Sequence, residues 1–302
     1  MDLPGNFSEE CANGRAVEAL APIGEARLPK LLFADAHADR PSVALKSASA
    51  IAGSLGAELH VVSVLPRLSS LCIREGVPYD SAEARRCVEE CVATFRYTRA
   101  WFEDTLGEPL ALPRLRIRFG TPAEVIAERA GELEAFLVVL APVVQSLGPT
   151  AIGVARACSC PVLVARGLSE LGAVIAATDL QDIRYRVVRQ ASALGAALGS
   201  RVIAVHNVSS LSTPLGSCLD ARVSPAPELP RRMLAELPVP LQFVVTTDLD
   251  PVRAIVEQAE HHRSGIIVVG ARSQSSGRFE ASVPSEVIER SRCSVLVTSL
   301  ET

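Results

Sequence analysis

The chain has 302 residues, of which 48% are hydrophobic and 21% are charged, so it is long enough for two domains that each bury a core. Its formal net charge of −4 and its lack of a Lys or Arg block give no electrostatic reason to expect nucleic acid, and its apolar runs are too short to cross a membrane. The first residues lack the order of a signal peptide and the eight cysteines lack CxxC spacing, so we expect a soluble, cytoplasmic protein with reduced thiols.

Residues 1–27 are interpreted as an N-terminal extension that precedes the first regular element. The apolar run "KLLFA" predicts a short strand ending at Asp35, and a helix is expected from about Ser42. The apolar residues of that helix share one face, at spacings of three and four: Leu45, Ala48, Ala52 and Leu55. A turn glycine and the strand "HVVSV" follow.

The next segment, "YDSAEARRCVEECVATFRYTRAWFEDTLG", predicts one long amphipathic helix capped by Asp80, with Glu83 three residues on. Its apolar positions predict packing against the core: Val88, Cys91, Phe95, Phe102 and Leu106. Another helix is predicted to begin with Thr121 as its N-cap, Pro122 at the first helical position and Glu124 completing a capping box.

The first half of the chain ends with the apolar strand "AFLVVLA", a loop and the strand "PVLVA". Cys158 and Cys160 flank one serine just before that last strand. We favour packed thiols over a dithiol switch for this pair, and both interpretations are open to test. Only one of the two has a counterpart in the second half, Cys293.

The second half repeats the order of elements. The strand "AVIAA" leads to Thr178 and Asp179, and the apolar stripe of the following helix is Ile183, Val187, Ala191, Leu194 and Leu198. Asp250 and Pro251 are predicted to open the helix after the third strand. The strands "GIIVVG" and "SVLVT" then enclose a Gly- and Ser-rich loop and a helix.

Three pairs of matching segments show that the two halves are an internal repeat. "SLGAELHVVSV" matches "ALGSRVIAVHN", "TPAEVIAERA" matches "DPVRAIVEQA", and "ARACSCPVLVA" matches "IERSRCSVLVT". In both copies continuous apolar strands alternate with helices, which predicts a parallel, doubly wound sheet in each copy.

The order of these motifs resembles a universal stress protein domain: an apolar strand ending in Asp, a helix, "HVVSV", "GTPAEVIAERA", an apolar strand, a loop and "CPVLVA". The chain resembles a tandem of two, with domain 1 at 28–167 and domain 2 at 168–302. The resemblance implies an α/β fold of two mainly parallel five-stranded sheets with helices on both faces, Rossmann-like and similar to the adenine nucleotide alpha hydrolases. It also implies that the two domains form a pseudo-dimer within the chain, through the strands "PVLVA" and "SVLVT".

For nucleotide-binding members, the resemblance implies a Gly-x-x-Gly element, a spacer, and Gly-Ser or Gly-Thr at a helix start, with an Asp from the first strand beside the adenosine. Glycines let the backbone approach phosphates, and a helix N-terminus offers N–H donors. Domain 1 departs from this pattern, because Ala141 and Val144 replace two glycines and Pro149 replaces the hydroxyl residue. We therefore expect no ATP in domain 1, although Asp35 is retained.

Domain 2 keeps part of the loop. Gly270 and Ser282 match the pattern, but Ser273 stands for the second glycine and Ala281 for the third. These losses favour a degenerate loop, and the alternative is a weak site for ATP with Mg²⁺. In that case the resemblance implies that Asp179 lies near the adenosine and that the other site residues lie at the phosphates: Gly270, Arg272, Ser273, Gly277, Ser282 and Val283.

Two classes of function follow from the sequence. We favour a non-enzymatic universal stress protein, acting in stress response or signalling through a change of assembly, such as a homodimer, or of contact with a protein partner. The alternative is an ATP-hydrolysing or other nucleotide-dependent enzyme that uses the domain 2 loop. That enzyme would need a general base, and the nearby Glu280 and Glu286 both suit an exposed helix start. No catalytic residue, metal site or membrane insertion is predicted.

Overall fold

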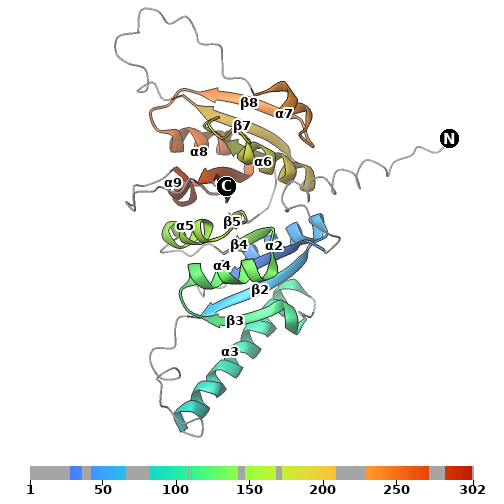
Figure 1. The fold of residues 1–302 in the computed structure, drawn as a ribbon, viewed down its shortest axis with the longest axis vertical. Helices are drawn as coiled ribbons and strands as arrows, with labels where there is room; N and C mark the ends of the chain where they lie inside the picture. Colours follow the sequence, from blue (N-terminus) through green and yellow to red (C-terminus); the bar gives the residue numbers. More distant parts are fainter. Residues whose placement is uncertain are drawn as a thin grey trace, which may run out of the picture. The chain divides into compact units, whose positions relative to one another are not determined.

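The structure of the protein is a computed structural model (Figure 1). The structure describes residues 28–35, 42–65, 82–107, 109, 111–141, 147–167, 172–208, 229–271 and 283–300. The chain divides into two compact units, one made of Leu28–Arg166 and the other containing Gly167–Thr302, which we call domain 1 and domain 2. No helix in the described ranges is long and apolar enough to cross a membrane.

Domain 1 is a five-stranded parallel sheet with the strand order β3-β2-β1-β4-β5. Its strands are β1 (Lys30–Asp35), β2 (Glu58–Leu65), β3 (Leu115–Phe119), β4 (Leu137–Leu140) and β5 (Val162–Val164). Its helices are α2 (Ser42–Leu55), α3 (Ala82–Leu106), α4 (Pro122–Leu133) and α5 (Leu147–Ala157), with a 3-10 turn at Leu112–Arg114.

Domain 2 repeats this topology, with the strand order β10-β9-β6-β7-β8 and parallel pairing throughout. Its strands are β6 (Ala173–Ala177), β7 (Arg201–Asn207), β8 (Leu241–Thr246), β9 (Ser264–Ala271) and β10 (Ser294–Ser299). Its helices are α6 (Arg186–Ala197), α7 (Arg231–Ala235), α8 (Pro251–His261) and α9 (Val283–Arg290). The predicted fold class, two tandem parallel α/β domains, is confirmed.

Continuous apolar strands form the cores, as strands covered on both faces require. All four residues of β4 are buried, and β9 is buried over five consecutive residues. The predicted apolar face of α2 is also confirmed, since its four residues are buried: Leu45, Ala48, Ala52 and Leu55. Hydrophobic burial on both faces of each sheet is therefore the main source of stability in both domains.

The long helix predicted in domain 1 is α3. Its Phe102 is fully buried and meets Phe33 of β1 edge to face, with the ring centroids 6.0 Å apart. Phe95 and Leu106 are partly exposed. The expected cap Asp80 and the side chains of Val88 and Cys91 lie outside the described residues.

One predicted helix start and one predicted capping interaction need correction. Helix α6 begins at Arg186, so Ile183 is not on its apolar stripe and is instead 87% exposed. The cause is Asp182, whose carboxylate accepts the backbone N–H groups of Arg184 and Arg186 and so forms a turn before the helix. Helix α4 does have Thr121 as its N-cap residue, but the side chain makes no capping hydrogen bond.

Candidate functional site

A pocket of about 180 Å³ lies at the carboxyl ends of the domain 2 strands. It is at the switch point of the sheet, between β6 and β9, where the chain connections run to opposite sides and where open α/β sheets bind ligands. Ala177 of β6 pairs with Val269 of β9, so the residues that follow them lie side by side. The pocket lining is Ala177, Thr178, Asp179, Asp182, Tyr185, Val187, Val205, Asn207, Pro251, Ile255, Val269, Gly270, Val283 and Leu300.

The loop from Thr178 to Arg186 is held by its own side chains. Thr178 Oγ1 accepts the N–H of Leu180 at 3.1 Å, and Asp179 Oδ1 accepts the N–H of Gln181 at 2.9 Å. These bonds hold Leu180 in the left-handed region, with φ of 61°. His206 adds a ring nitrogen 2.9 Å from the carbonyl oxygen of Thr178. The loop that carries Asp179 is therefore fixed in position.

Gly270 lies against Leu300, the residue that follows β10. A Cβ added to Gly270 would be 2.6 Å from Leu300 Cδ1 and 2.9 Å from its Cγ, closer than such atoms pack. The Leu300 N–H also donates to the Ala271 carbonyl oxygen at 2.9 Å. Packing by Leu300 therefore explains this glycine without any phosphate, and it places an apolar side chain where the resemblance implied phosphate contact.

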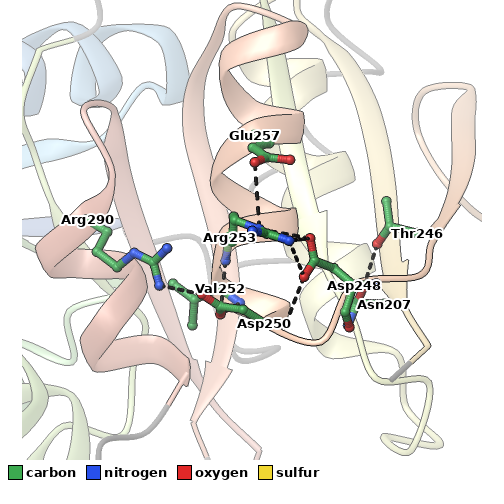
Figure 2. Close-up of polar contacts among 8 residues, drawn as sticks. All are labelled: Asn207, Thr246, Asp248, Asp250, Val252, Arg253, Glu257 and Arg290. Atoms are coloured by element: carbon green, nitrogen blue, oxygen red, sulfur yellow. Dashed lines mark hydrogen bonds and ion pairs between the residues drawn. The ribbon is translucent and has the colours of Figure 1, made fainter. Parts of the chain in front are cut away.

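A polar network beside β7 and α8 includes one residue of the pocket lining, Asn207 (Figure 2). Asn207 binds Asp248 in both directions, as its Nδ2 donates to the Asp248 carbonyl oxygen and its Oδ1 accepts the Asp248 N–H, each at 3.0 Å. Thr246 Oγ1 donates to the same Oδ1 at 3.0 Å. Arg253 donates to both carboxylate oxygens of Asp248, at 2.7 and 2.9 Å. The Asp250 N–H and the Arg253 guanidinium hold the pKa of Asp248 below its usual value.

Asp250 caps α8 as predicted. Its Oδ1 accepts the N–H groups of Val252 at 2.9 Å and Arg253 at 3.1 Å, and its Oδ2 accepts Arg290 Nη1 at 2.8 Å (Figure 2). The hydrogen bond from Arg290 lowers the pKa of Asp250. These polar groups position α8 and α9, the helices that supply Ile255 and Val283 to the pocket.

The pocket wall combines apolar side chains with carboxylates. Val187, Val205, Ile255 and Val269 supply apolar surface, while Asp179 and Asp182 supply acceptors. Among the described lining residues there is no Lys, Arg or His. The described wall thus offers apolar surface to an uncharged ring and acceptors to hydroxyl donors.

The retained aspartate of domain 1 differs from that of domain 2 in its exposure. Asp35 is 1% exposed, whereas its counterpart Asp179 is exposed. Asp35 pairs in register with Ser63 of β2, which is fully buried, and Phe33 on the same face is covered by α3. The two equivalent aspartates therefore differ, with Asp35 buried and Asp179 exposed.

The structure brings together three of the predicted site residues, because Asp179, Gly270 and Val283 all line the pocket. The other four lie outside the described residues: Arg272, Ser273, Gly277 and Ser282. Sequence reasoning missed Tyr185, Asn207 and Leu300, which line the same pocket. A signal for Asn207 was available, because it ends a strand beside the one that leads to Asp179.

Comparison with known proteins identifies the class. The universal stress protein family model matches residues 29–166 and again 171–299. The chain therefore belongs to the universal stress protein family and contains two of its domains in tandem. None of the curated proteins compared with the chain matches it.

Solved structures share the fold over most of the chain. A universal stress protein from Archaeoglobus fulgidus DSM 4304 has 16% identity and a TM-score of 0.62, with 90% of this chain and 98% of that one covered. A functionally unknown protein from Pseudomonas aeruginosa PAO1 has 16% identity and a TM-score of 0.59, with 90% and 92% covered. A shorter universal stress protein, solved in complex with cAMP, has 25% identity and a TM-score of 0.34, covering 44% of this chain and 100% of its own.

Proposed function

We propose that this protein is a non-enzymatic universal stress protein that acts in stress response or signalling, and that its domain 2 pocket binds the nucleoside part of an adenine nucleotide weakly. Domain 1 has a structural role in the same chain. The observation that carries this proposal is the pocket at the domain 2 switch point, where Asp179 and Gly270 meet, in contrast to the buried Asp35 of domain 1.

The fit of a nucleoside follows from the pocket wall. Val205, Ile255 and Val269 provide apolar surface for a flat base, and the base gains from leaving water. The exposed Asp179 can accept hydrogen bonds from ribose hydroxyls, which is how acidic residues recognise a ribose in other doubly wound folds. Leu300 covers Gly270, so phosphates gain little there and the affinity for ATP with Mg²⁺ stays low.

Several polar groups around the pocket have structural roles, which supports a binding function over catalysis. Asp182 holds the turn before α6, Asn207 holds Asp248, and Asp250 caps α8. A general base has to reach a proton on the substrate, and these groups are engaged with the backbone instead.

Titration calorimetry with adenosine, AMP and ATP with Mg²⁺ tests the binding proposal. We expect weak binding of all three with similar affinity, lost in Asp179→Ala and kept in Gln181→Ala, a neutral exposed neighbour that does not line the pocket. Binding of ATP far above that of adenosine would show that phosphate recognition dominates. No binding of any of them, or an equal loss in both variants, would refute the pocket.

Phosphate release from ATP tests the enzymatic alternative. We expect no sustained release by the full chain with Mg²⁺. Sustained turnover that Ser282→Ala abolishes would overturn the non-enzymatic proposal.

The proposal also includes pairing of the two domains within one chain, through β5 and β10. If they pair, backbone amides on the open edges of these strands become hydrogen-bonded and exchange slowly with deuterium. We expect such protection in the full chain at a concentration where native mass spectrometry shows monomers. Fast exchange of both strands in the monomer would contradict the pseudo-dimer.

A further inference from the structure

Cys158 and Cys160 lie in the turn that joins α5 to β5 in domain 1. Cys158 extends the helix by one residue, since its N–H donates to the Val154 carbonyl oxygen at 2.9 Å. The chain then bends at Ser159 and Cys160 before β5. Residues two apart have Cα atoms at most about 7 Å apart, and a bend shortens this, so the pair can reach the separation of about 4.4–6.8 Å that a disulfide needs.

The two thiols have different surroundings. Cys158 is 5% exposed, whereas Cys160 is partly exposed. Both are thiols and not in disulfides. A partly exposed cysteine thus lies two residues from a buried one in the same turn.

Domain 2 provides an internal comparison in which the pair is absent. Ser291 occupies the position of Cys158: it is also 5% exposed, and its N–H donates to the Val287 carbonyl oxygen at 2.9 Å. Its Oγ donates to the carbonyl oxygen of Cys293, the counterpart of Cys160, at 3.0 Å. A hydroxyl thus satisfies the fold at this turn, so packing and helix ending do not require a second thiol.

We propose that Cys158 and Cys160 form a redox-active dithiol that a hydroperoxide oxidises to an intramolecular disulfide. Cys160 is the attacking thiol and Cys158 is the resolving thiol. This site is separate from the domain 2 pocket and does not depend on its ligand.

The electrostatics support this division of roles. The hydrogen bond from Cys158, together with backbone N–H groups including that of Val138, lowers the pKa of Cys160. The same hydrogen bond and burial raise the pKa of Cys158. Thiolates are the nucleophiles in thiol chemistry, so Cys160 reacts first.

The reaction balances in two steps. Cys160 gives its thiol proton to water, and its thiolate attacks the terminal oxygen of the hydroperoxide, so the O–O bond breaks and Cys160 becomes a sulfenic acid. The alkoxide or hydroxide that leaves takes up that proton from water and departs as alcohol or water. The Cys158 sulfur then attacks the Cys160 sulfur, and its proton leaves with the hydroxyl as water. Two electrons pass from the two thiols to the peroxide, and one S–S bond forms.

Peptide mapping of the full chain tests the proposal, because trypsin cleavage at Arg156 and Arg166 gives a peptide, Ala157–Arg166, whose only cysteines are this pair. The reduced protein is treated with hydrogen peroxide, alkylated and digested. We expect this peptide to lose alkylation at both cysteines, to lose the mass of two hydrogens, and to recover both thiols with a reductant. The matched control is the peptide Cys293–Thr302, which should stay alkylated at the same peroxide dose.

Cys158→Ser copies the domain 2 arrangement and removes the resolving thiol. In this variant we expect Cys160 to be trapped by dimedone as a sulfenic acid, an outcome that a merely structural role would not give. The proposal is overturned if both cysteines of the wild-type peptide stay alkylatable, if they go to sulfinic acids without a disulfide, or if Cys293 is oxidised as fast as Cys160.

Discussion

Replacing Gly270 with alanine tests whether Leu300 packing, rather than a ligand, requires glycine at this position. In the structure the new methyl group would lie 2.6, 2.9 and 3.1 Å from Leu300 Cδ1, Cγ and Cδ2. The contact is with the side chain of a partly exposed residue after the last strand, so Leu300 can rotate away and lose its packing.

The change in the free energy of unfolding has two opposing contributions: the cost of overpacking against Leu300 and the gain from a less flexible unfolded chain. Overpacking typically costs 1–3 kcal/mol, and because Leu300 can move we expect Gly270→Ala to lower the free energy of unfolding by about 1 kcal/mol. In a Leu300→Ala background the clash disappears, and Gly→Ala is then neutral or stabilising by about 0.4–1 kcal/mol through the unfolded chain. The coupling between the two substitutions is therefore about 1–2 kcal/mol, within the range measured for residues in contact.

Urea unfolding of the wild type, both single variants and the double variant measures this coupling, with hydrogen exchange of β9 to assign the change to domain 2. Gly53→Ala is the matched control, because nothing lies within 4 Å of the added Cβ in α2, and it should stabilise domain 1 slightly. An equal penalty for Gly270→Ala in both backgrounds would refute Leu300 packing as the reason for the glycine.

Three further predictions test the account of the fold. Gly172→Ala should lower the midpoint of thermal unfolding more than Gly270→Ala, because the added Cβ would lie 2.5 Å from the Arg263 backbone oxygen, which cannot rotate away; an equal effect would contradict this reasoning. Asp250→Ala should destabilise the protein more than Thr121→Ala, because only Asp250 makes capping hydrogen bonds, and calorimetric melting of both variants decides it. Burial lowers the pKa of His60, so the unfolded chain takes up the proton first and stability should fall as the pH drops below about 6.5, the value for an exposed imidazole. In His60→Gln the melting midpoint should fall less as the pH drops through that range. An unchanged slope of the midpoint against pH would exclude His60 as the source of the pH dependence.

The fold was predictable from the sequence because its signals are repeated and local. Continuous apolar runs predicted buried parallel strands, and the matching segments gave the same prediction in both halves of the chain. Asp250 and Pro251 marked the start of α8 to the residue. At α6 the same approach was wrong, because Ile183 fits the helical spacing but Asp182 bonds the following N–H groups and delays the helix.

The candidate site was predictable only where it resembles the family pattern. Asp179 lies just after β6 and Gly270 lies near the end of the adjacent β9, so their proximity at the switch point could be expected. The role of Leu300 could not, because it depends on a contact between the end of β10 and a glycine in β9 that are far apart in sequence. The different surroundings of Cys158 and Cys160 likewise depend on the bend before β5, which spacing alone does not give.

The most direct test of the central claim is a methyl NMR titration of the full chain with AMP. The account predicts shifts confined to methyl groups that line the domain 2 pocket, such as those of Val205, Ile255 and Val269, and no shift of Val139 in the domain 1 core. Shifts at Val139 without any at the pocket, or no shifts at saturating AMP, would contradict it.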